Sequence, residues 1–410
     1  MIDDSVRVAV VGAGHGGTTV AALLRQHGFG GPVTLVGAEP HPPYHRPPLS
    51  KSAGGALEPL RPEAFYAEQR IGLTLGATVR ALDARESVLL LDDGSRLVSD
   101  VVVLALGARP RRLQVPGADL PGVHTLRTVD DARALTGELG PGRSLVVVGG
   151  GYIGLEIAST ARRLGAEVTV VEVAERVLGR SAGAELADRL TARHRAQGTR
   201  ILTGTAVAGL TPAPDGRVGA VVLDSGRSLP CDVVLVGIGA QPCDELARSA
   251  GLECDGGVLV DERGRTSAPG VWAVGDMTRR PLAGRSGRFR LESIPSAGEQ
   301  AKQVVADLLG LPAPAPEVPW FWSDQFDLKL KIAGLVGLGE TTVVRGDLDG
   351  GRFAVFHLDG AGRVVAVETV NSPGEFMAGK KWMAAGSVVR PDALADASAP
   401  LRESIVEGAT

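Results

Sequence analysis

Cysteine, long apolar runs and net charge are all scarce in this sequence, and each scarcity excludes a class of protein. Only three cysteines, Cys231, Cys243 and Cys254, occur in 410 residues. They are too few and too widely spaced for a disulfide framework or a zinc site, so we expect free thiols and no metal. No uninterrupted apolar run reaches the roughly 18 residues of a membrane span. The net charge of −4 gives no reason to expect nucleic acid as a partner.

The amino terminus lacks a basic region followed by an apolar stretch, so we expect no signal peptide and a cytoplasmic protein. What the sequence has in abundance is glycine, at 56 residues, which suits tight turns and close approach of backbone to a ligand. A hydrophobic fraction of 44% with 22% charged residues is typical of a soluble folded protein. A chain of 410 residues exceeds one ordinary core, so two or three domains are expected.

A strand–helix–strand pattern occurs twice in the chain. Residues 6–39 and residues 144–172 each contain an apolar strand, a glycine-rich turn, a helix-length segment and a second apolar strand that ends at a glutamate. Such βαβ units are the building blocks of dinucleotide-binding domains. The sequence therefore predicts an α/β protein with two Rossmann-like domains.

The segments outside the repeat suggest where the domains begin and end. Apolar strands at residues 101–110 and 232–242 each close in a turn and mark the points at which the chain changes domain. A loop and amphipathic helix over residues 290–310 lead to a proline-rich linker over residues 311–320. We also expect a hairpin over residues 352–370.

A helix over residues 376–385 follows the hairpin, so the last domain is predicted to be a small α+β module. We predict three domains: a first dinucleotide-binding domain (residues 1–113 and 242–318), a second (residues 114–241) and the carboxy-terminal module (residues 319–410).

The first glycine-rich turn has the spacing of a phosphate-binding fingerprint. Gly12, Gly14 and Gly17 form G-x-G-x-x-G between a strand and a helix. The first glycine permits the tight turn, the second admits the pyrophosphate, and the third lets helix and strand pack closely. The amino terminus of the helix offers N–H groups to the phosphates, and Glu39 lies where a carboxylate can accept from a ribose hydroxyl.

The second turn repeats this spacing with Gly149, Gly151 and Gly154, followed by Glu172. One fingerprint alone is weak evidence, whereas two in the same structural context indicate dinucleotide binding. Glu172 favours NADH over NADPH because a carboxylate accepts from a free 2′-hydroxyl but repels a 2′-phosphate. Arg176 and Arg180 lie nearby in sequence and either weaken that preference or are solvated surface residues.

Five segments resemble a known family. They are PPYHRPPLSK (42–51), LRTVDDARAL (126–135), GGGYIGLE (149–156), RLESIPSAGEQA (290–301) and PWFWSDQFDLKLKIAGL (319–335). Together with the two fingerprints they resemble putidaredoxin reductase and the oxygenase-coupled NADH:ferredoxin reductases, which are flavoproteins with two dinucleotide-binding domains. The resemblance covers essentially the whole chain and weakens after about Val389. It implies that the first domain binds FAD and the second binds NADH.

The resemblance also implies a role for several residues at the flavin. The residues that it places against FAD are Gly16, Glu39, Val79, Arg127, Asp276 and Ile294. Lys51 is implied to lie near the flavin N5 and to pair with Glu156, while Tyr152 covers the flavin face that nicotinamide must reach. From the residues alone, a surface lysine and an ordinary first-turn helix acid are the simpler interpretation of Lys51 and Glu156.

Three positions depart from the family pattern. Leu106 stands where the family more often has threonine, Ala38 where many relatives carry an acid, and Ser296 where asparagine is common. The fingerprint glycines and Asp276 are intact, so the expectation of FAD is unchanged.

The cysteine content decides how electrons leave the flavin. Relatives that reduce disulfides carry a C-x₄-C or C-x-x-C pair, whereas the first cysteine here is Cys231. Thiol relay chemistry therefore has no nucleophile. The chain also lacks a set of four cysteines for an iron–sulfur cluster, so any cluster belongs to a partner.

Two features suggest how an acidic [2Fe–2S] ferredoxin would dock and receive electrons. Trp322 is predicted either to line the electron exit or simply to pack within the third domain. The second feature is a set of six bases (Arg279, Arg280, Arg285, Arg288, Arg290 and Lys302) against two acids (Glu292 and Glu299), a local charge of +4. This stretch is interpreted as a docking patch or as a solvated loop.

The leading interpretation is an NADH:ferredoxin reductase that serves a haem-thiolate monooxygenase or a ring-hydroxylating dioxygenase. The alternatives are a rubredoxin reductase or a soluble NADH dehydrogenase. A flavin-containing redox sensor similar to apoptosis-inducing factor is less favoured, because the sequence has no basic tail or large insertion.

Overall fold

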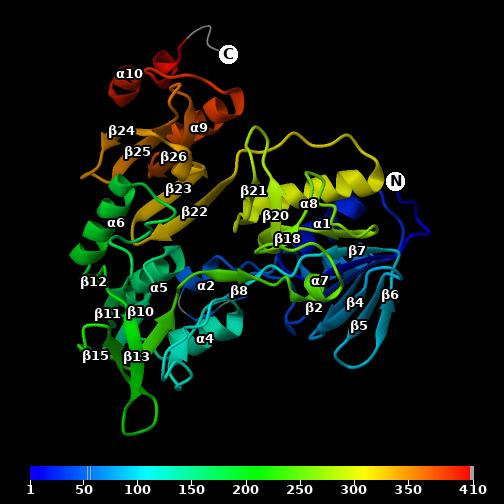
Figure 1. Cartoon of the computed structure of the whole chain (residues 1–410), viewed down its shortest axis with the longest axis horizontal. Coiled ribbons are helices and arrows are strands. Elements are labelled where there is room, and N and C mark those ends of the chain that lie inside the picture. Colours follow the sequence, from blue (N-terminus) through cyan, green and yellow to red (C-terminus); the bar gives the residue numbers. More distant parts are fainter. Residues whose placement is uncertain (53, 56, 407–410) are drawn as a thin grey trace. The chain divides into compact units, whose positions relative to one another are not determined.

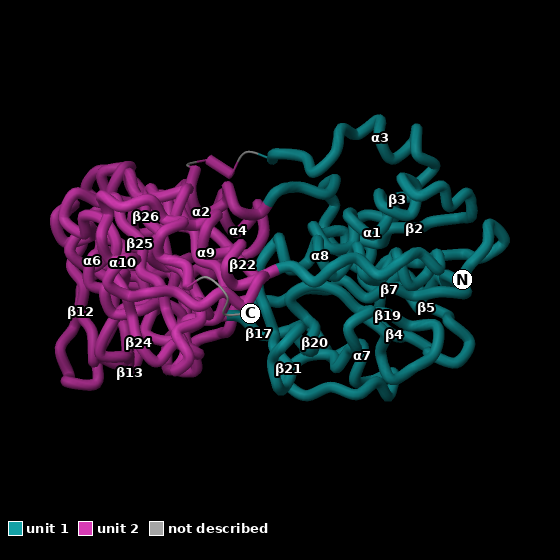
Figure 2. The backbone as a smooth tube through the Cα atoms, turned by 90° about the horizontal axis from the view of Figure 1, so that it is seen from above, with its two compact units in different colours: residues 1–45, 57–109, 240–317 teal, residues 46–56, 110–239, 318–410 magenta. Residues whose placement is uncertain are grey.

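The computed structural model describes residues 1–52, 54–55 and 57–406. The chain divides into two compact units (Figure 2). Unit 1 comprises residues 1–45, 57–109 and 240–317, and unit 2 comprises residues 46–56, 110–239 and 318–410. Apart from residues 240–241, which belong to unit 1, the second and third predicted domains fall within unit 2. The three-domain division stays a prediction.

A five-stranded parallel sheet forms the centre of unit 1. Its order is β19 (Val271–Ala273), β7 (Val101–Leu104), β1 (Val8–Val11), β2 (Val33–Gly37) and β3 (Ile71–Leu75). Every residue of β1 and β7 is buried, as expected for central strands of a parallel sheet that is covered on both faces. Helices α1 (His15–Gln26) and α8 (Ile294–Leu309) pack against each other and share one apolar core with these strands (Figure 1).

Two smaller sheets complete unit 1. One is antiparallel and contains β4 (Val79–Asp83), β5 (Val88–Leu91) and β6 (Arg96–Val98). The other contains β18 (Val258–Leu259), β20 (Thr278–Pro281) and β21 (Arg288–Phe289). The sequence analysis did not predict these strands, because all of them are short and β4, β6, β20 and β21 also contain charged residues.

Unit 2 repeats the parallel arrangement. The strand order is β12 (Arg200–Leu202), β11 (Glu167–Val171), β10 (Ser144–Val148), β16 (Val233–Val236) and β9 (Val123–His124). Helices α5 (Tyr152–Arg163) and α6 (Ala184–Ala196) share its core, and α4 (Val129–Gly137) begins with a capping box between Thr128 and Asp131. A three-stranded antiparallel sheet follows, made of β13 (Val207–Pro212), β14 (Val218–Leu223) and β15 (Ser228–Pro230).

The carboxy-terminal part of unit 2 is an antiparallel sheet covered by a helix (Figure 1). Its strand order is β22 (Trp320–Gln325), β23 (Leu328–Gly334), β26 (Val364–Val370), β25 (Arg352–Leu358) and β24 (Thr341–Asp347). The antiparallel pairing of β25 with β26 confirms the predicted hairpin. Helix α9 (Pro373–Ala385) begins three residues before the predicted start, at Pro373, because proline suits the first turn of a helix.

Two predicted strands each break into two pieces where the chain changes unit. After β7, a turn at Gly107 leads to β8 (Ala108–Pro110), and after β16 the chain continues into β17 (Ala240–Pro242). Strands β8 and β17 pair as a two-stranded sheet, and the boundaries of the units fall at residues 109/110 and 239/240. No helix in the described part of the chain is both long and apolar enough to span a membrane.

Arg345, on β24, binds the backbone of residues 394–399 near the carboxy terminus. Its buried guanidinium lies 3.6 Å from the carboxylate of Glu375 on α9. It also donates to four backbone carbonyl oxygens, those of Leu394 (3.1 Å), Asp396 (2.5 Å), Ala397 (3.5 Å) and Ala399 (2.7 Å). One side chain thus satisfies backbone carbonyls at the end of α10 (Pro391–Ala395) and in the residues that follow it.

We expect Arg345→Met to destabilise this segment selectively. The change leaves carbonyl oxygens and Glu375 without their donor, at a cost of about 2–4 kcal/mol. Thermal unfolding measures the loss, and limited proteolysis locates it at faster cleavage after residue 390. Arg352→Met removes an exposed arginine from the neighbouring strand and serves as the control. If Arg345→Met and Arg352→Met lowered the melting temperature and sped cleavage equally, the role given to Arg345 would be contradicted.

Candidate functional site

The first glycine-rich turn, in unit 1, has the shape of a phosphate cradle. Gly12 has φ +115°, and a Cβ added there would lie 2.2 Å from the carbonyl oxygen of Ala105. A Cβ at Gly17 would lie 2.0 Å from the carbonyl oxygen of Gly12. At Gly14 a Cβ would meet no described atom within 4 Å. The backbone is therefore closed on two sides and open at the middle glycine, where a ligand can approach.

The amino terminus of α1 lies at this opening. Gly14 is its N-cap residue, no described side chain caps it, and no acidic residue occupies its first turn. Because the first N–H groups of a helix have no intrahelical acceptor, they are available to an anion there. The cradle thus fits a dinucleotide pyrophosphate. Glu39, two residues after β2, accepts a hydrogen bond from the hydroxyl of Tyr44.

The structure places the other residues expected at FAD as follows. Gly16 lies in α1, Val79 begins β4, Asp276 lies in the 3₁₀ turn after β19, and Ile294 begins α8, whose N-cap is Ser293. All four belong to unit 1. Arg127 belongs to unit 2, where its backbone N–H donates to Asp131 (2.9 Å) and its carbonyl accepts from Arg46 (2.7 Å). Their roles at FAD stay predictions.

The second cradle, in unit 2, repeats the geometry of the first. Gly149 has φ +107°, and a Cβ there would lie 2.5 Å from the carbonyl oxygen of Gly237. A Cβ at Gly154 would lie 2.3 Å from the carbonyl oxygen of Gly149. Gly151 is the N-cap of α5, again with no described side chain as a cap. This turn also fits a pyrophosphate.

The carboxylate of Glu172 is fixed at the edge of the second cradle. It accepts from the backbone N–H of Gly150 (2.7 Å) and from that of Ala174 (2.8 Å). Both bonds hold a negative charge beside the glycine turn. Arg176 donates to the carbonyl of Ala182 (3.2 Å), and Arg180 is exposed. Glu172 is therefore positioned by backbone, as a residue that selects for a free ribose hydroxyl would be.

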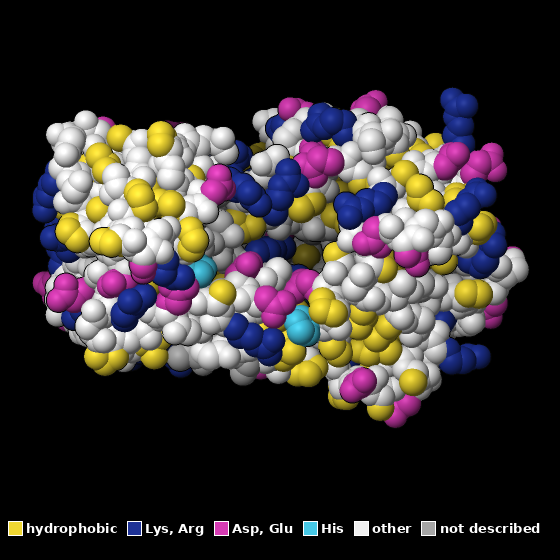
Figure 3. Space-filling view, turned by 90° about the horizontal axis from the view of Figure 1, so that it is seen from below, with side chains coloured by type: hydrophobic (Ala, Val, Ile, Leu, Met, Phe, Trp, Pro, Cys, Tyr) yellow, Lys and Arg dark blue, Asp and Glu magenta, His cyan; other side chains and the backbone are white. Residues whose placement is uncertain are grey.

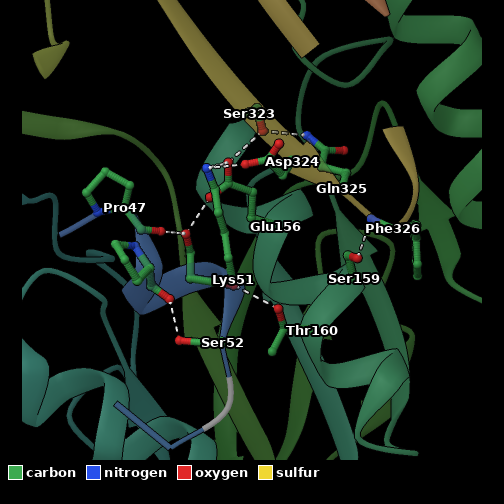
Figure 4. Close-up of polar contacts among 12 residues, drawn as sticks. Pro47, Lys51, Ser52, Glu156, Ser159, Thr160, Ser323, Asp324, Gln325 and Phe326 are labelled. Carbon is green, nitrogen blue, oxygen red and sulfur yellow. Dashed lines mark hydrogen bonds and ion pairs between the residues drawn. The ribbon is translucent and has the colours of Figure 1, made fainter. Parts of the chain in front are cut away.

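An ion pair with one buried carboxylate joins three segments of unit 2 (Figure 4). Glu156 lies in α5 and is 4% exposed, while Lys51 ends the short helix α2 (Pro48–Lys51). The Lys51 Nζ atom is 3.6 Å from Glu156 Oε1 and 3.0 Å from Asp324 Oδ2 on β22. The structure therefore brings together the two residues that the resemblance pairs, and adds a second carboxylate.

Two serines complete the surroundings of Glu156. The hydroxyl of Ser50 donates to one carboxylate oxygen, and the hydroxyl of Ser323 donates to the other at 2.6 Å. Burial raises the pKa of Glu156, while the charge of Lys51 and the two hydroxyl donors act in the opposite direction. The ionised form of Glu156 is therefore favoured only by its contacts with Lys51, Ser50 and Ser323.

Helix α2 is tied to α5 through its backbone. The hydroxyl of Thr160 donates to the carbonyl of Ser50 (2.8 Å), and the guanidinium of Arg163 donates to the carbonyl of Lys51 (2.6 Å). These bonds fix both donors of α2, the Ser50 hydroxyl and the Lys51 ammonium, relative to Glu156.

Aromatic side chains flank this ion pair. The Lys51 Nζ atom lies 5.6 Å from the ring centroid of Trp322, within the range of a cation–π contact. Tyr152, at the first position of α5, packs edge-on against Phe321 with 5.0 Å between ring centroids. Lys51, Glu156 and Trp322 therefore form one cluster, and Tyr152 lies on the same helix as Glu156. Their catalytic roles stay predictions.

Three members of this cluster were missed by the sequence analysis. Ser50, Ser323 and Asp324 contact Lys51 or Glu156 only because the fold brings residues 50, 156 and 323 together. Their position in the sequence could have indicated them: Ser50 directly precedes Lys51 in one family segment, and Ser323 and Asp324 directly follow Trp322 in another.

Four of the six bases in the predicted basic patch form ion pairs with acids. Arg280 is buried against Glu299, Arg290 pairs with Glu292, and Lys302 pairs with Glu317 at 2.7 Å. Arg279 pairs with Asp255. The sequence count missed Asp255 and Glu317 because they lie outside the stretch, so six bases face four acids.

The remaining positive charge comes from Arg285 and Arg288, which are both exposed. On the face drawn in Figure 3, basic and acidic side chains are interspersed. Any docking through this stretch stays a prediction.

Two of the three cysteines have thiols that burial keeps neutral. Burial, with a smaller contribution from the charge of Asp232, raises the pKa of Cys231 to about 12. Burial also raises the pKa of Cys254. Neutral thiols are poor nucleophiles, which agrees with the exclusion of thiol relay chemistry.

Comparison with known proteins gives consistent matches over the whole chain. The family "Pyridine nucleotide-disulphide oxidoreductase" matches residues 6–301, and "Reductase C-terminal" matches residues 320–405. The second match extends beyond Val389, where the resemblance was expected to weaken.

Individual relatives agree with the family matches. A probable ferredoxin reductase of Castellaniella defragrans is 44% identical over 95% of this chain and 96% of its own. The ferredoxin–NAD(+) reductase subunit of the benzene 1,2-dioxygenase system of Pseudomonas putida is 40% identical over 97% of each chain. The solved covalent complex of putidaredoxin reductase with putidaredoxin has a TM-score of 0.94 and 39% identity over 98% of each chain.

We expect Glu156→Gln to change the pH dependence of stability. Because the folded-state pKa of Glu156 is raised, its contribution favours folding below the unfolded pKa of about 4.5 and is lost as pH rises through the folded pKa. Glutamine removes this loss, so the melting temperature of Glu156→Gln should rise relative to wild type between pH 5 and 8. Glu167→Gln, at an exposed glutamate, is the control. If the difference in melting temperature between Glu156→Gln and wild type did not change with pH, the raised pKa of Glu156 would be contradicted.

Proposed function

This chain belongs to the pyridine nucleotide-disulphide oxidoreductase family, and we propose that it passes electrons from NADH through FAD to a [2Fe–2S] ferredoxin that serves an oxygenase. Family membership confirms the predicted α/β fold, the resemblance to the ferredoxin reductases and the assignment as an oxidoreductase. It also confirms FAD and NAD(H) as the cofactors. The residues that bind them, and the acceptor of the electrons, belong to the proposal.

One observation carries the proposal: two dinucleotide cradles occur in a chain without a usable thiol pair. Hydride arrives from NADH as two electrons, and FAD, when bound, can release them one at a time. With no cysteine before Cys231, the electrons cannot continue through a disulfide. A one-electron acceptor in a partner protein fits this constraint. For each NADH oxidised, two ferredoxins gain one electron each and one proton is released.

The relatives support a ferredoxin as that acceptor. The names of two of them contain ferredoxin reductase, one within a benzene dioxygenase system, and a solved relative is bound to putidaredoxin. We therefore propose a ring-hydroxylating dioxygenase or a haem-thiolate monooxygenase as the final acceptor, and a cytoplasmic location. None of the relatives described above is named for a rubredoxin or a quinone.

The chain's own residues would orient the two cofactors. The Gly12 turn would hold the FAD pyrophosphate, and the Gly149 turn that of NADH, each against a helix amino terminus. Lys51, held chiefly by Glu156, would present a positive charge where the reduced flavin is negative. Trp322, in contact with Lys51, would border the route by which electrons leave. Tyr152 would yield its position to the incoming nicotinamide ring.

The test is a comparison of electron acceptors with the purified flavoprotein. We expect NADH to bleach the flavin band anaerobically, and fast cytochrome c reduction only when a [2Fe–2S] ferredoxin is added. The ferredoxin raises the rate because cytochrome c takes its electrons from the reduced cluster. Equal rates without ferredoxin, or faster turnover with quinones, would overturn the proposed acceptor. A colourless protein that takes up no flavin would overturn the whole assignment.

Glu172→Ser tests the proposed preference for NADH. Removing the carboxylate relieves its repulsion of a 2′-phosphate, so the ratio of kcat/KM for NADH to that for NADPH should fall about tenfold or more, at least ~1.4 kcal/mol. Glu175→Ser removes an exposed carboxylate three residues away and should leave the ratio unchanged. If Glu172→Ser also leaves it unchanged, another residue determines the preference.

A further inference from the structure

A line of buried polar side chains leads away from Glu156 within unit 2. The hydroxyl of Ser323 donates to Glu156 (2.6 Å), and the amide nitrogen of Gln325 donates to Ser323 Oγ (3.2 Å). The amide oxygen of Gln325 lies 3.0 Å from Nε2 of His194, on α6. Ser323, Gln325 and His194 are all 0% exposed. Figure 4 shows the part of this line that runs from Gln325 through Ser323 to Glu156.

The bonds in this line have a direction. Each serine hydroxyl, amide and imidazole can both donate and accept, so the line could in principle run either way. As the amide of Gln325 is placed, its oxygen can only accept, so Nε2 of His194 is the donor. The donors then run from His194 to Gln325 to Ser323 to the carboxylate. A line of donors that ends on a carboxylate stabilises the charged form.

The reversed direction requires three changes. Glu156 would have to be protonated and donate to Ser323, the amide of Gln325 would have to turn over, and His194 would have to carry its hydrogen on Nδ1. That nitrogen is buried and has no partner among the described residues. A buried N–H without an acceptor is unfavourable, so His194 keeps its hydrogen on Nε2 and the reversed line is disfavoured.

We propose that His194 is a positioning residue, which acts through Gln325 and Ser323 to hold Glu156 as the carboxylate that binds Lys51. The inference rests on the proposed function in one respect: it gives the Lys51–Glu156 pair its importance at the flavin. The line does not conduct protons, because the amide of Gln325 would have to exchange its own hydrogen to pass one on. Its effect is electrostatic and geometric.

The charged groups around this line lie at Glu156 or are paired with one another, and His194 is the uncharged end of the line. Glu156 faces Lys51 on α2 and Asp324 on β22. Beside His194, Arg193 on α6 is paired with Asp327 at 2.7 Å, and the ring of Phe326 packs edge-on with 4.9 Å between centroids. Burial lowers the pKa of His194, which keeps the imidazole uncharged.

The test compares three variants of the FAD-loaded protein by infrared titration. The C=O stretch of protonated Glu156 is assigned by its loss in Glu156→Gln and followed against pH. His194→Leu removes the terminal donor, so the apparent pKa of Glu156 should rise by about one unit, a tenfold change in proton affinity. His194→Gln restores an amide donor and should return the pKa toward the wild-type value. Thr199→Val, which removes an unpartnered buried hydroxyl beside His194, should leave it unchanged.

Gln325→Leu breaks the line one position closer to Glu156 and should raise the pKa by a similar amount. An unchanged titration in both leucine variants would overturn the inference, as would an equal shift in Thr199→Val. These results are independent of the electron acceptor: the titration can shift in a protein that reduces no ferredoxin. A fully active ferredoxin reductase with an unshifted titration would refute only the role of His194.

Discussion

The contacts among α2, α5 and β22 depend on the constraint that a carboxylate cannot remain charged in the interior without partners. Glu156 satisfies this constraint with the hydroxyls of Ser50 and Ser323 and the ammonium of Lys51. These donors come from α2 and β22, two elements that are distant from α5 in the sequence. One buried charge therefore fixes the helix that ends at Lys51 and the strand that carries Trp322.

The two cradles depend on a different constraint, the space available to backbone. Glycine is required at Gly12 and Gly149 because φ is positive and a neighbouring carbonyl occupies the place of a Cβ. This requirement is local, since strand, turn and helix follow one another in the chain. For that reason the sequence predicted both cradles, the acids that follow them and the hairpin of β25 and β26.

Features that depend on distant residues were predicted less well. Glu156 and Lys51 were paired by family resemblance, whereas Ser323, Asp324 and His194 were not anticipated, because nothing local in the sequence marks them as neighbours of α5. The basic patch was overestimated for the same reason: Asp255 and Glu317 approach it only in the folded chain. Short strands such as β6, with an exposed arginine at its start, also lack a local pattern strong enough to predict.

The contacts of Lys51 differ in what each contributes. Asp324 is closer to the ammonium than Glu156, at 3.0 Å against 3.6 Å, but its side chain is 43% exposed. Solvent screens an exposed ion pair, so the shorter contact contributes little to holding the lysine. The longer contact is made to a carboxylate that is only 5% exposed, and solvent screens a charge interaction less there. Glu156 therefore determines the position of Lys51, and whatever keeps Glu156 ionised also determines the charge that Lys51 presents.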